Sequence, residues 1–350
     1  MNKLIADKVF GKTGYKVPAI VYGTSYLGNL YTALDENTKL EIVKKWFECT
    51  ETPVFIDSAG KYGAGLALEM IGKLLEKQNI SPNDIVISNK LGWYRIPLTT
   101  PEPTFEPGAW ADIKNDAVQK ISYKGIIDCW EQGCELLGNK YRAQLVSVHD
   151  PDEYLAVATT DSEFKHRLDD VLSAYKALFE LKAKGEVKAV GIGSKDWEII
   201  KLLSDHVDFD WVMFANSFTL LSHPPEIIEF IEKLQSKQTG IINSAVFNAG
   251  FLTGGEYFDY QKVDPASDLG KRIYLWREMF FDLCDQFYVK APDACIQFGI
   301  SHPAISSIAL NTSKPEKMNR NVDTITRKIP SEFWDAMKQQ GLIASDYSYV

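Results

Sequence analysis

The sequence has no long apolar run, few cysteines and no basic cluster, and each absence narrows the class of protein. No apolar stretch approaches the ~18 residues that a membrane span requires, and the N-terminus lacks the hydrophobic region of a secretion signal. The five cysteines are odd in number and scattered, which argues against a zinc site or a disulfide framework. We therefore expect a cytoplasmic protein without a metal site.

Two further absences concern partners and fold. The net charge is -9 and no Lys/Arg-rich run interrupts it, so neither nucleic acid nor a membrane surface is an expected partner. The sequence also lacks a G-x-G-x-x-G turn after its first expected strand. The glycines of residues 60–65 have a different spacing and follow the second expected strand. This argues against a doubly wound dinucleotide-binding fold.

What is present is a regular alternation of short β-rich runs and helical patterns. The β-rich runs are residues 19–23, 54–57, 85–90, 144–149, 187–193, 211–215, 240–245 and 306–310. The helical patterns are residues 38–49, 66–75, 125–137, 168–184, 197–203, 226–234 and 291–298. Eight β/α alternations favour a closed (β/α)8 barrel, with residues 1–350 forming a single domain. Residues 8–17 read as an N-terminal β-hairpin.

Two segments are too long to be simple connections. Residues 91–123 are rich in proline and aromatic side chains, and residues 248–268 are rich in glycine, phenylalanine and tyrosine. Both follow expected strands, so both should lie on the catalytic face as lids or binding loops. In the first, Trp93, Tyr94 and Trp110 are candidate stacking surfaces for a substrate, although a folded-down loop buries such rings equally often.

Four polar residues lie at or just beyond expected strand ends, where (β/α)8 barrels carry their chemistry. They are Asp57, Tyr62, Lys90 and His149. An isolated phenol has a pKa near ~10, and a neighbouring ammonium such as Lys90 would lower it. Asp57 would hold that ammonium, and His149 would donate a hydrogen bond to a reacting oxygen. Taken singly, each residue also fits an ordinary cap, a solvated charge or a buried polar group.

These residues resemble a known pattern, that of the aldo-keto reductase superfamily, and the resemblance covers nearly the whole chain. Residues 57–65 read D-S-A-G-K-Y-G-A-G, matching the motif D-[ST]-A-x-x-Y-G-x-G. The resemblance implies a nicotinamide-dependent oxidoreductase with Tyr62 as general acid/base, Asp57 and Lys90 as its tuning pair, and His149 as the substrate-orienting residue.

A narrower resemblance concerns residues 122–126, 148–152 and 246–250. They are similar to the branch that holds D-threo-aldose 1-dehydrogenase, L-fucose dehydrogenase, L-galactose dehydrogenase and pyridoxal 4-dehydrogenase. Lys124 stands where that branch usually carries an acid.

The same resemblance implies the cofactor contacts. They are Gly23, Thr24, Ser194, Asn216, Phe247, Ser313, Lys314 and Asn321. Family members that select NADP usually carry an arginine at the position of Ser313, because a bidentate fork suits a ribose phosphate. Its absence favours NAD, while Lys314 and Lys317 leave NADP open.

The expected activity is hydride transfer between nicotinamide and C1 of an aldose resembling L-fucose or L-galactose, with a lactone as product. One alternative is an NADPH-dependent reductase of small aldehydes or ketones. An alternative of another class is a cofactor-binding regulatory subunit, and a barrel acting on phosphosugars without nicotinamide is remoter. The sequence leaves the oligomeric state open.

Overall fold

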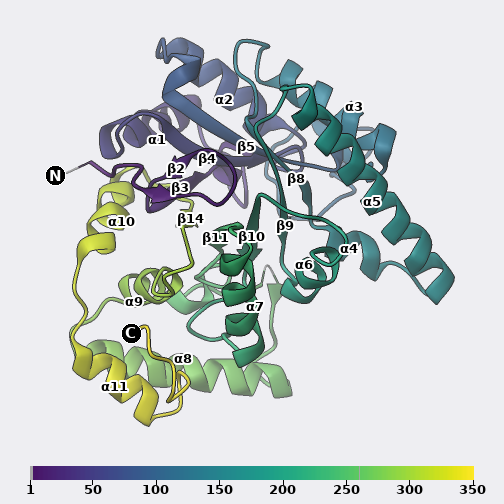
Figure 1. Cartoon of the computed structure of the whole chain (residues 1–350). Coiled ribbons are helices and arrows are strands. Elements are labelled where there is room, and N and C mark those ends of the chain that lie inside the picture. Colours follow the sequence, from purple (N-terminus) through teal and green to yellow (C-terminus); the bar gives the residue numbers. More distant parts are fainter. Residues whose placement is uncertain (1–2, 260) are drawn as a thin grey trace.

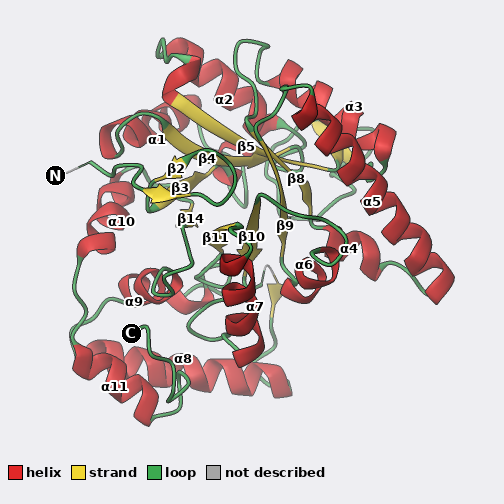
Figure 2. Ribbon diagram, viewed as in Figure 1, coloured by secondary structure: helices red, strands yellow, loops and turns green. Residues whose placement is uncertain are grey.

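The computed structural model describes residues 3–259 and 261–350, and its centre is a closed barrel of eight parallel strands. Figure 2 shows these strands enclosed by helices. Around the barrel the strands follow the order β10, β11, β14, β3, β4, β5, β8 and β9. Their bounds are β3 Ile20–Gly23, β4 Val54–Ala59, β5 Ile85–Leu91, β8 Leu145–His149, β9 Ala189–Ser194, β10 Trp211–Ala215, β11 Gly240–Ser244 and β14 Ser307–Leu310. The expected (β/α)8 barrel is confirmed.

Helices cover the outside of the barrel because each presents one apolar face to the strands. Their bounds are α1 Glu36–Cys49, α2 Leu66–Lys77, α3 Tyr123–Leu136, α4 Pro151–Ala156, α5 Asp161–Ala183, α6 Trp197–Leu203, α7 Pro225–Ser236, α8 Asp268–Gln286, α9 Ala291–Gly299, α10 Glu316–Thr326 and α11 Ser331–Gln339. Figure 1 shows α8 and α11 together at one edge, beside the C-terminus. No helix in the described ranges is long and apolar enough to cross a membrane.

An N-terminal hairpin closes the end of the barrel at which the strands begin. β1 (Lys8–Val9) and β2 (Lys16–Val17) pair antiparallel, as expected. Between them, Phe10 lies fully buried, and its ring centroid is 6.1 Å from that of Trp211. A side chain at Gly11 would lie 2.1 Å from the backbone nitrogen of Gly240, so the hairpin approaches β11 with no space between them. The other end of the barrel is left for the site.

Both long segments lie over that other end, and both hold more structure than the sequence indicated. The first contains the antiparallel pair β6 (Trp93–Pro97) and β7 (Asn115–Gln119). The second contains a 3₁₀ turn, Phe251–Thr253, and the short pair β12 (Tyr257–Phe258) and β13 (Gln261–Lys262). Residue 260 of this segment lies outside the described residues.

Candidate active site

Four polar side chains meet at the C-terminal end of the barrel strands. Asp57 lies in β4 and Lys90 in β5, and the two strands pair with Ala59 opposite Lys90. His149 ends β8, which pairs with β5 on its other side. Tyr62 lies in the turn between β4 and α2. Three neighbouring strands therefore bring together the four residues that their places at expected strand ends suggested.

Close backbone contact fixes the turn that carries Tyr62. Gly63 has φ +61°, a left-handed conformation that glycine adopts without strain. A Cβ atom there would lie 2.3 Å from the carbonyl oxygen of Gly28, and a Cβ atom on Gly28 would lie 2.7 Å from the carbonyl carbon of Tyr62. Only glycine at both positions allows this approach, so the turn has little freedom to move.

Asp57 and Lys90 form a buried ion pair beneath the phenol. Lys90 Nζ donates to Asp57 Oδ2, and Ser88 Oγ donates to Asp57 Oδ1 at 3.1 Å. Each of the paired side chains is 4% exposed. Lys90 Nζ lies 4.8 Å from the centroid of the Tyr62 ring. The ammonium is thus held beside the phenol by a carboxylate that neutralises its charge.

The pKa of Tyr62 shows how these charges balance. Burial raises the pKa of Tyr62 well above its usual value, and the charge of Asp57 acts in the same direction. The net shift is opposite to the lowering expected from Lys90, because the phenol is buried and Asp57 offsets the ammonium. Tyr62 therefore carries its proton at neutral pH in this structure.

His149 is buried beside Tyr62 and neutral. The two ring centroids are 5.7 Å apart and the rings are nearly perpendicular, at 84°. Burial, followed by the charges of Lys90 and Lys61, lowers the pKa of His149 well below its usual range. Its Nδ1 atom is buried without a hydrogen-bond partner within the described chain. The neutral imidazole can thus form a hydrogen bond with a ligand without carrying a charge.

The four side chains line a cavity of about 940 Å³ whose two sides differ in charge. On the side of α10 the wall holds Lys314, Lys317 and Arg320. The chain enters α10 from β14. In the barrel of eight strands β14 lies four strands from β8, so the two are on opposite sides of the cavity. The wall near β8 and β9 holds the charged side chains of Lys61, Glu106, Asp150, Glu153 and Lys195. A cationic region thus faces a mixed region richer in carboxylates.

The residues expected to hold a nicotinamide cofactor lie mainly along this cavity. Those in its wall are Gly23, Thr24, Ser194, Phe247, Ser313, Lys314 and Asn321. Asn216 directly follows β10, next to the end of β9 that carries Ser194, and its Oδ1 atom is buried without a partner in residues 3–259 and 261–350. An unpaired amide oxygen and a hydroxyl on adjacent strands fit the carboxamide of nicotinamide. The N-terminus of α10, with nearby lysines, fits phosphate groups.

Of the three aromatic candidates for substrate contact, only Trp110 lies in the cavity wall, with its ring centroid 5.9 Å from that of Tyr62. Trp93 lies outside the wall and packs on Phe105. Tyr94 lies beneath Lys120, whose Nζ atom is 3.7 Å from the centroid of the Tyr94 ring. The two rings are consecutive in β6 and so point to opposite faces of the hairpin, and neither is part of the cavity wall.

Lys124 also lies away from the cavity. Its side chain is 85% exposed on α3 and pairs with Asp128 at 2.7 Å. The departure from the branch at this position is thus a feature of the protein surface.

Sequence reasoning missed the charged residues around Lys61. Lys61 stands inside the motif of residues 57–65, directly before Tyr62, and that position was the available signal. Its partners come from residues 91–123 and from α4, so no local pattern could have linked them.

The parallel barrel, the acid–amine–phenol–imidazole group and the polar cavity are the features expected of a nicotinamide-dependent oxidoreductase of the barrel class. The sequence matches the aldo/keto reductase family over residues 19–341, and the chain belongs to that family. It is an NAD(P)-dependent oxidoreductase, as expected.

Individual relatives agree with the expected branch. The chain is 29% identical to pyridoxal 4-dehydrogenase of Microbacterium luteolum, covering 98% of this chain and 99% of the relative. It is 29% identical to D-threo-aldose 1-dehydrogenase of a Pseudomonas species, covering 94% and 96%. Its fold is similar to aldo-keto reductase AKR11C1 from Bacillus halodurans (holo form), with a TM-score of 0.69, 18% identity, and coverage of 99% and 98%.

Proposed function

We propose that this enzyme oxidises C1 of the cyclic hemiacetal of a neutral aldose, with L-fucose or L-galactose as the type of sugar, and releases a lactone. Asp57, Tyr62, Lys90 and His149 are the catalytic group. In this proposal Tyr62 accepts the hydroxyl proton and His149 orients the C1 oxygen. Bound nicotinamide supplies the hydride acceptor.

The observation that carries the substrate class is the charge of the cavity wall beside Tyr62. Four carboxyl groups, Glu106, Asp150, Glu153 and Asp259, stand with two ammonium groups, Lys61 and Lys195, so acidic side chains outnumber basic ones here. Carboxylates accept hydrogen bonds from hydroxyl groups, so this wall suits a polyhydroxy compound. It opposes a sugar acid or a phosphate ester, because like charges repel at close range.

The residues of the chain account for the proton transfer. Tyr62 has to be a phenolate to accept the hydroxyl proton. Lys90 Nζ, 4.8 Å from its ring centroid, favours that charge, whereas burial and Asp57 raise the pKa of the phenol and oppose it. The neutral His149 is able to donate a hydrogen bond to the C1 oxygen without competing for the proton. The Trp110 ring packs against the Tyr62 ring on the side of the loop.

A second candidate, the NADPH-dependent reduction of small aldehydes or ketones, is favoured by one observation. The raised pKa of Tyr62 keeps the phenol protonated, and a protonated phenol is ready to donate to a carbonyl oxygen. The two candidates share the catalytic group and differ in direction and in substrate.

For the cofactor we propose NAD at least as readily as NADP, because Ser313 offers no planar fork to a ribose phosphate. We further propose one catalytic domain over residues 1–350 and a cytoplasmic location. The five cysteines are all free thiols buried in the core, which is in keeping with a reducing compartment.

The test is a substrate screen with NAD and with NADP, followed at the nicotinamide absorbance. Its arms are free aldoses, sugar acids, pyridoxal and simple aldehydes. We expect the highest kcat/KM for oxidation of a neutral aldose. Much faster reduction of simple aldehydes than oxidation of any aldose would establish the reductase instead, and a preference for a sugar acid would contradict our interpretation of the cavity charge.

A further inference from the structure

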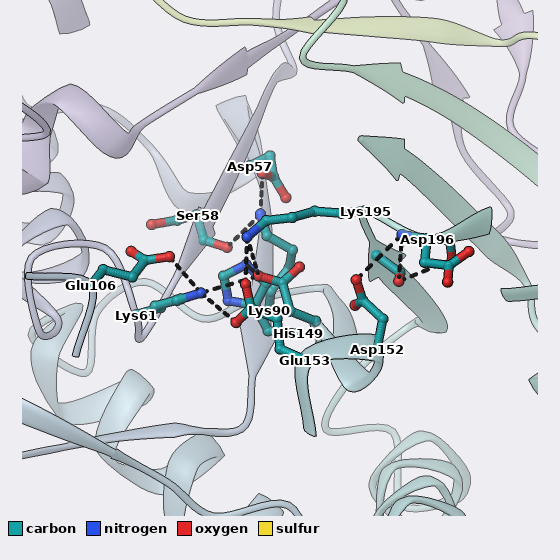
Figure 3. A network of polar contacts seen from close by, with 12 residues as sticks. Asp57, Ser58, Lys61, Lys90, Glu106, His149, Asp152, Glu153, Lys195 and Asp196 are labelled. Carbon is teal, nitrogen blue, oxygen red and sulfur yellow. Dashed lines mark hydrogen bonds and ion pairs between the residues drawn. The ribbon is translucent and has the colours of Figure 1, made fainter. Parts of the chain in front are cut away.

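Lys61 is a buried lysine surrounded by three carboxylates in the wall of the active-site cavity. Its side chain is 2% exposed. Lys61 Nζ lies 2.7 Å from Glu106 Oε1, 3.2 Å from Asp150 Oδ2 and 2.9 Å from Glu153 Oε2. Figure 3 shows Lys61 with Glu106 and Glu153 on either side of it. An ammonium has three N–H donors, so the three carboxylates account for all of them. Lys61 is thus placed to join parts of the protein rather than to bind substrate.

The first part of this arrangement links two catalytic residues through their neighbours in the chain. Lys61 directly precedes Tyr62, and Asp150 directly follows His149. The ion pair between Lys61 and Asp150 therefore connects the turn carrying the phenol to the strand end carrying the imidazole. Asp150 is itself held in place, since its backbone N–H donates to Gly193 O at 2.9 Å.

The second part links Lys61 to the segment above the site. Glu106 accepts from Lys61 with one carboxylate oxygen, and its other oxygen accepts from Trp110 Nε1 at 2.9 Å. The Trp110 ring packs against the Tyr62 ring. Backbone hydrogen bonds from Tyr31 N to Ala109 O and from Ala111 N to Asn29 O flank it, at 2.7 and 3.0 Å. The ammonium of Lys61 is thus one of the contacts that hold this loop, with Trp110, above the phenol.

We propose that Lys61 is a positioning residue for hydride transfer. Its ion pair with Asp150 aligns Tyr62 with His149, and its ion pair with Glu106 holds Trp110 over Tyr62. The inference rests on the proposed role of Tyr62 as the proton-transferring group. Misplacement of a reacting group by about 1 Å lowers a rate by the order of 100-fold, so loss of this alignment affects turnover more than cofactor binding.

The experiment compares Lys61→Met, which removes the charge, with Lys61→Arg, which keeps it. The readouts are kcat, KM for the best substrate of the screen, Kd for the cofactor by fluorescence quenching, and Tm. We expect Lys61→Met to lower kcat by about 100-fold with the cofactor Kd changed by less than about twofold. We expect Lys61→Arg to recover at least about tenfold of that loss, because the guanidinium keeps the ion pairs.

A matched control comes from the opposite end of the barrel. Lys182 Nζ donates to both carboxylate oxygens of Asp210, at 2.8 and 2.7 Å, far from the cavity. Lys182→Met should lower Tm and leave kcat unchanged. If Lys61→Met lowers Tm as Lys182→Met does and keeps its kcat, Lys61 is merely structural and the proposal is overturned.

Two milder variants keep the test decisive if Lys61→Met does not fold. Glu106→Gln should chiefly raise KM, because it loosens the cover over the substrate space. Asp150→Asn should chiefly lower kcat, because it weakens the link between Tyr62 and His149. Wild-type values for both variants would overturn the inference. Failure of the proposed function itself is recognised separately, by near-normal turnover in Tyr62→Phe.

Discussion

The buried pair of Asp57 and Lys90 allows the most quantitative prediction. In Asp57→Asn the ammonium of Lys90 keeps its position but loses its counter-charge, at a site where both side chains are 4% exposed. Removing one partner of a buried ion pair costs about 3–5 kcal/mol of unfolding free energy. In the double variant Asp57→Asn/Lys90→Met no charge is left unpaired, so the loss should be smaller than in Asp57→Asn alone.

The assay is urea unfolding followed by tryptophan fluorescence at constant pH and salt. Lys73→Met is the control, because its ion pair with Glu36 joins side chains that are 54% and 40% exposed; we expect no measurable change there. A loss below ~1 kcal/mol in Asp57→Asn, or a double variant less stable than the single one, would refute the reasoning. The same single variant should lower the pKa of Tyr62, since Asp57 is one of the charges that raise it.

The remaining predictions concern pH and cofactor choice. Because the pKa of Tyr62 is raised, the rate of carbonyl reduction should stay constant with pH through the neutral range, whereas the rate of oxidation, which needs the phenolate, should increase steadily with pH. Because the pKa of His149 is lowered, neither pH–rate profile should bend near the usual pKa of histidine. A bend there would assign a charged role to His149. Ser313→Arg should improve NADP binding by about 1–3 kcal/mol, the scale of a charged hydrogen bond, measured as Kd by fluorescence quenching. A strong NADP preference in the wild type would instead assign the phosphate contact to Lys314 or Lys317.

The barrel strands were predictable because each is a short apolar run with a clear end. The run at residues 211–215 is β10 itself, six others differ from the observed strands by one or two residues at one end, and the run at residues 187–193 differs from β9 at both ends. The catalytic group was predictable for the same reason, since strand ends in a closed barrel converge. Local sequence therefore carried the parts of the site that lie on or next to strands.

The parts that were not predicted depend on contacts between distant segments. The hairpin of β6 and β7 was missed because its strands are separated by residues 98–114. α8 was missed although Ser267 caps its N-terminus by accepting from Gly270 N. Neither the packing of Trp93 on Phe105 nor the ion pairs of Lys61 follow from spacing, because their partners are placed only when the long loop folds back.

The central claim is that Tyr62 transfers the proton during hydride exchange. The direct measurement is the turnover of Tyr62→Phe with the best substrate of the screen, beside the cofactor Kd. Tyr123→Phe, at an exposed position on α3, is the matched control and should match the wild type. We predict that Tyr62→Phe lowers kcat by at least ~100-fold with an almost unchanged cofactor Kd, because the ring remains and only the proton donor is lost. Turnover near the wild-type value in Tyr62→Phe would contradict the account.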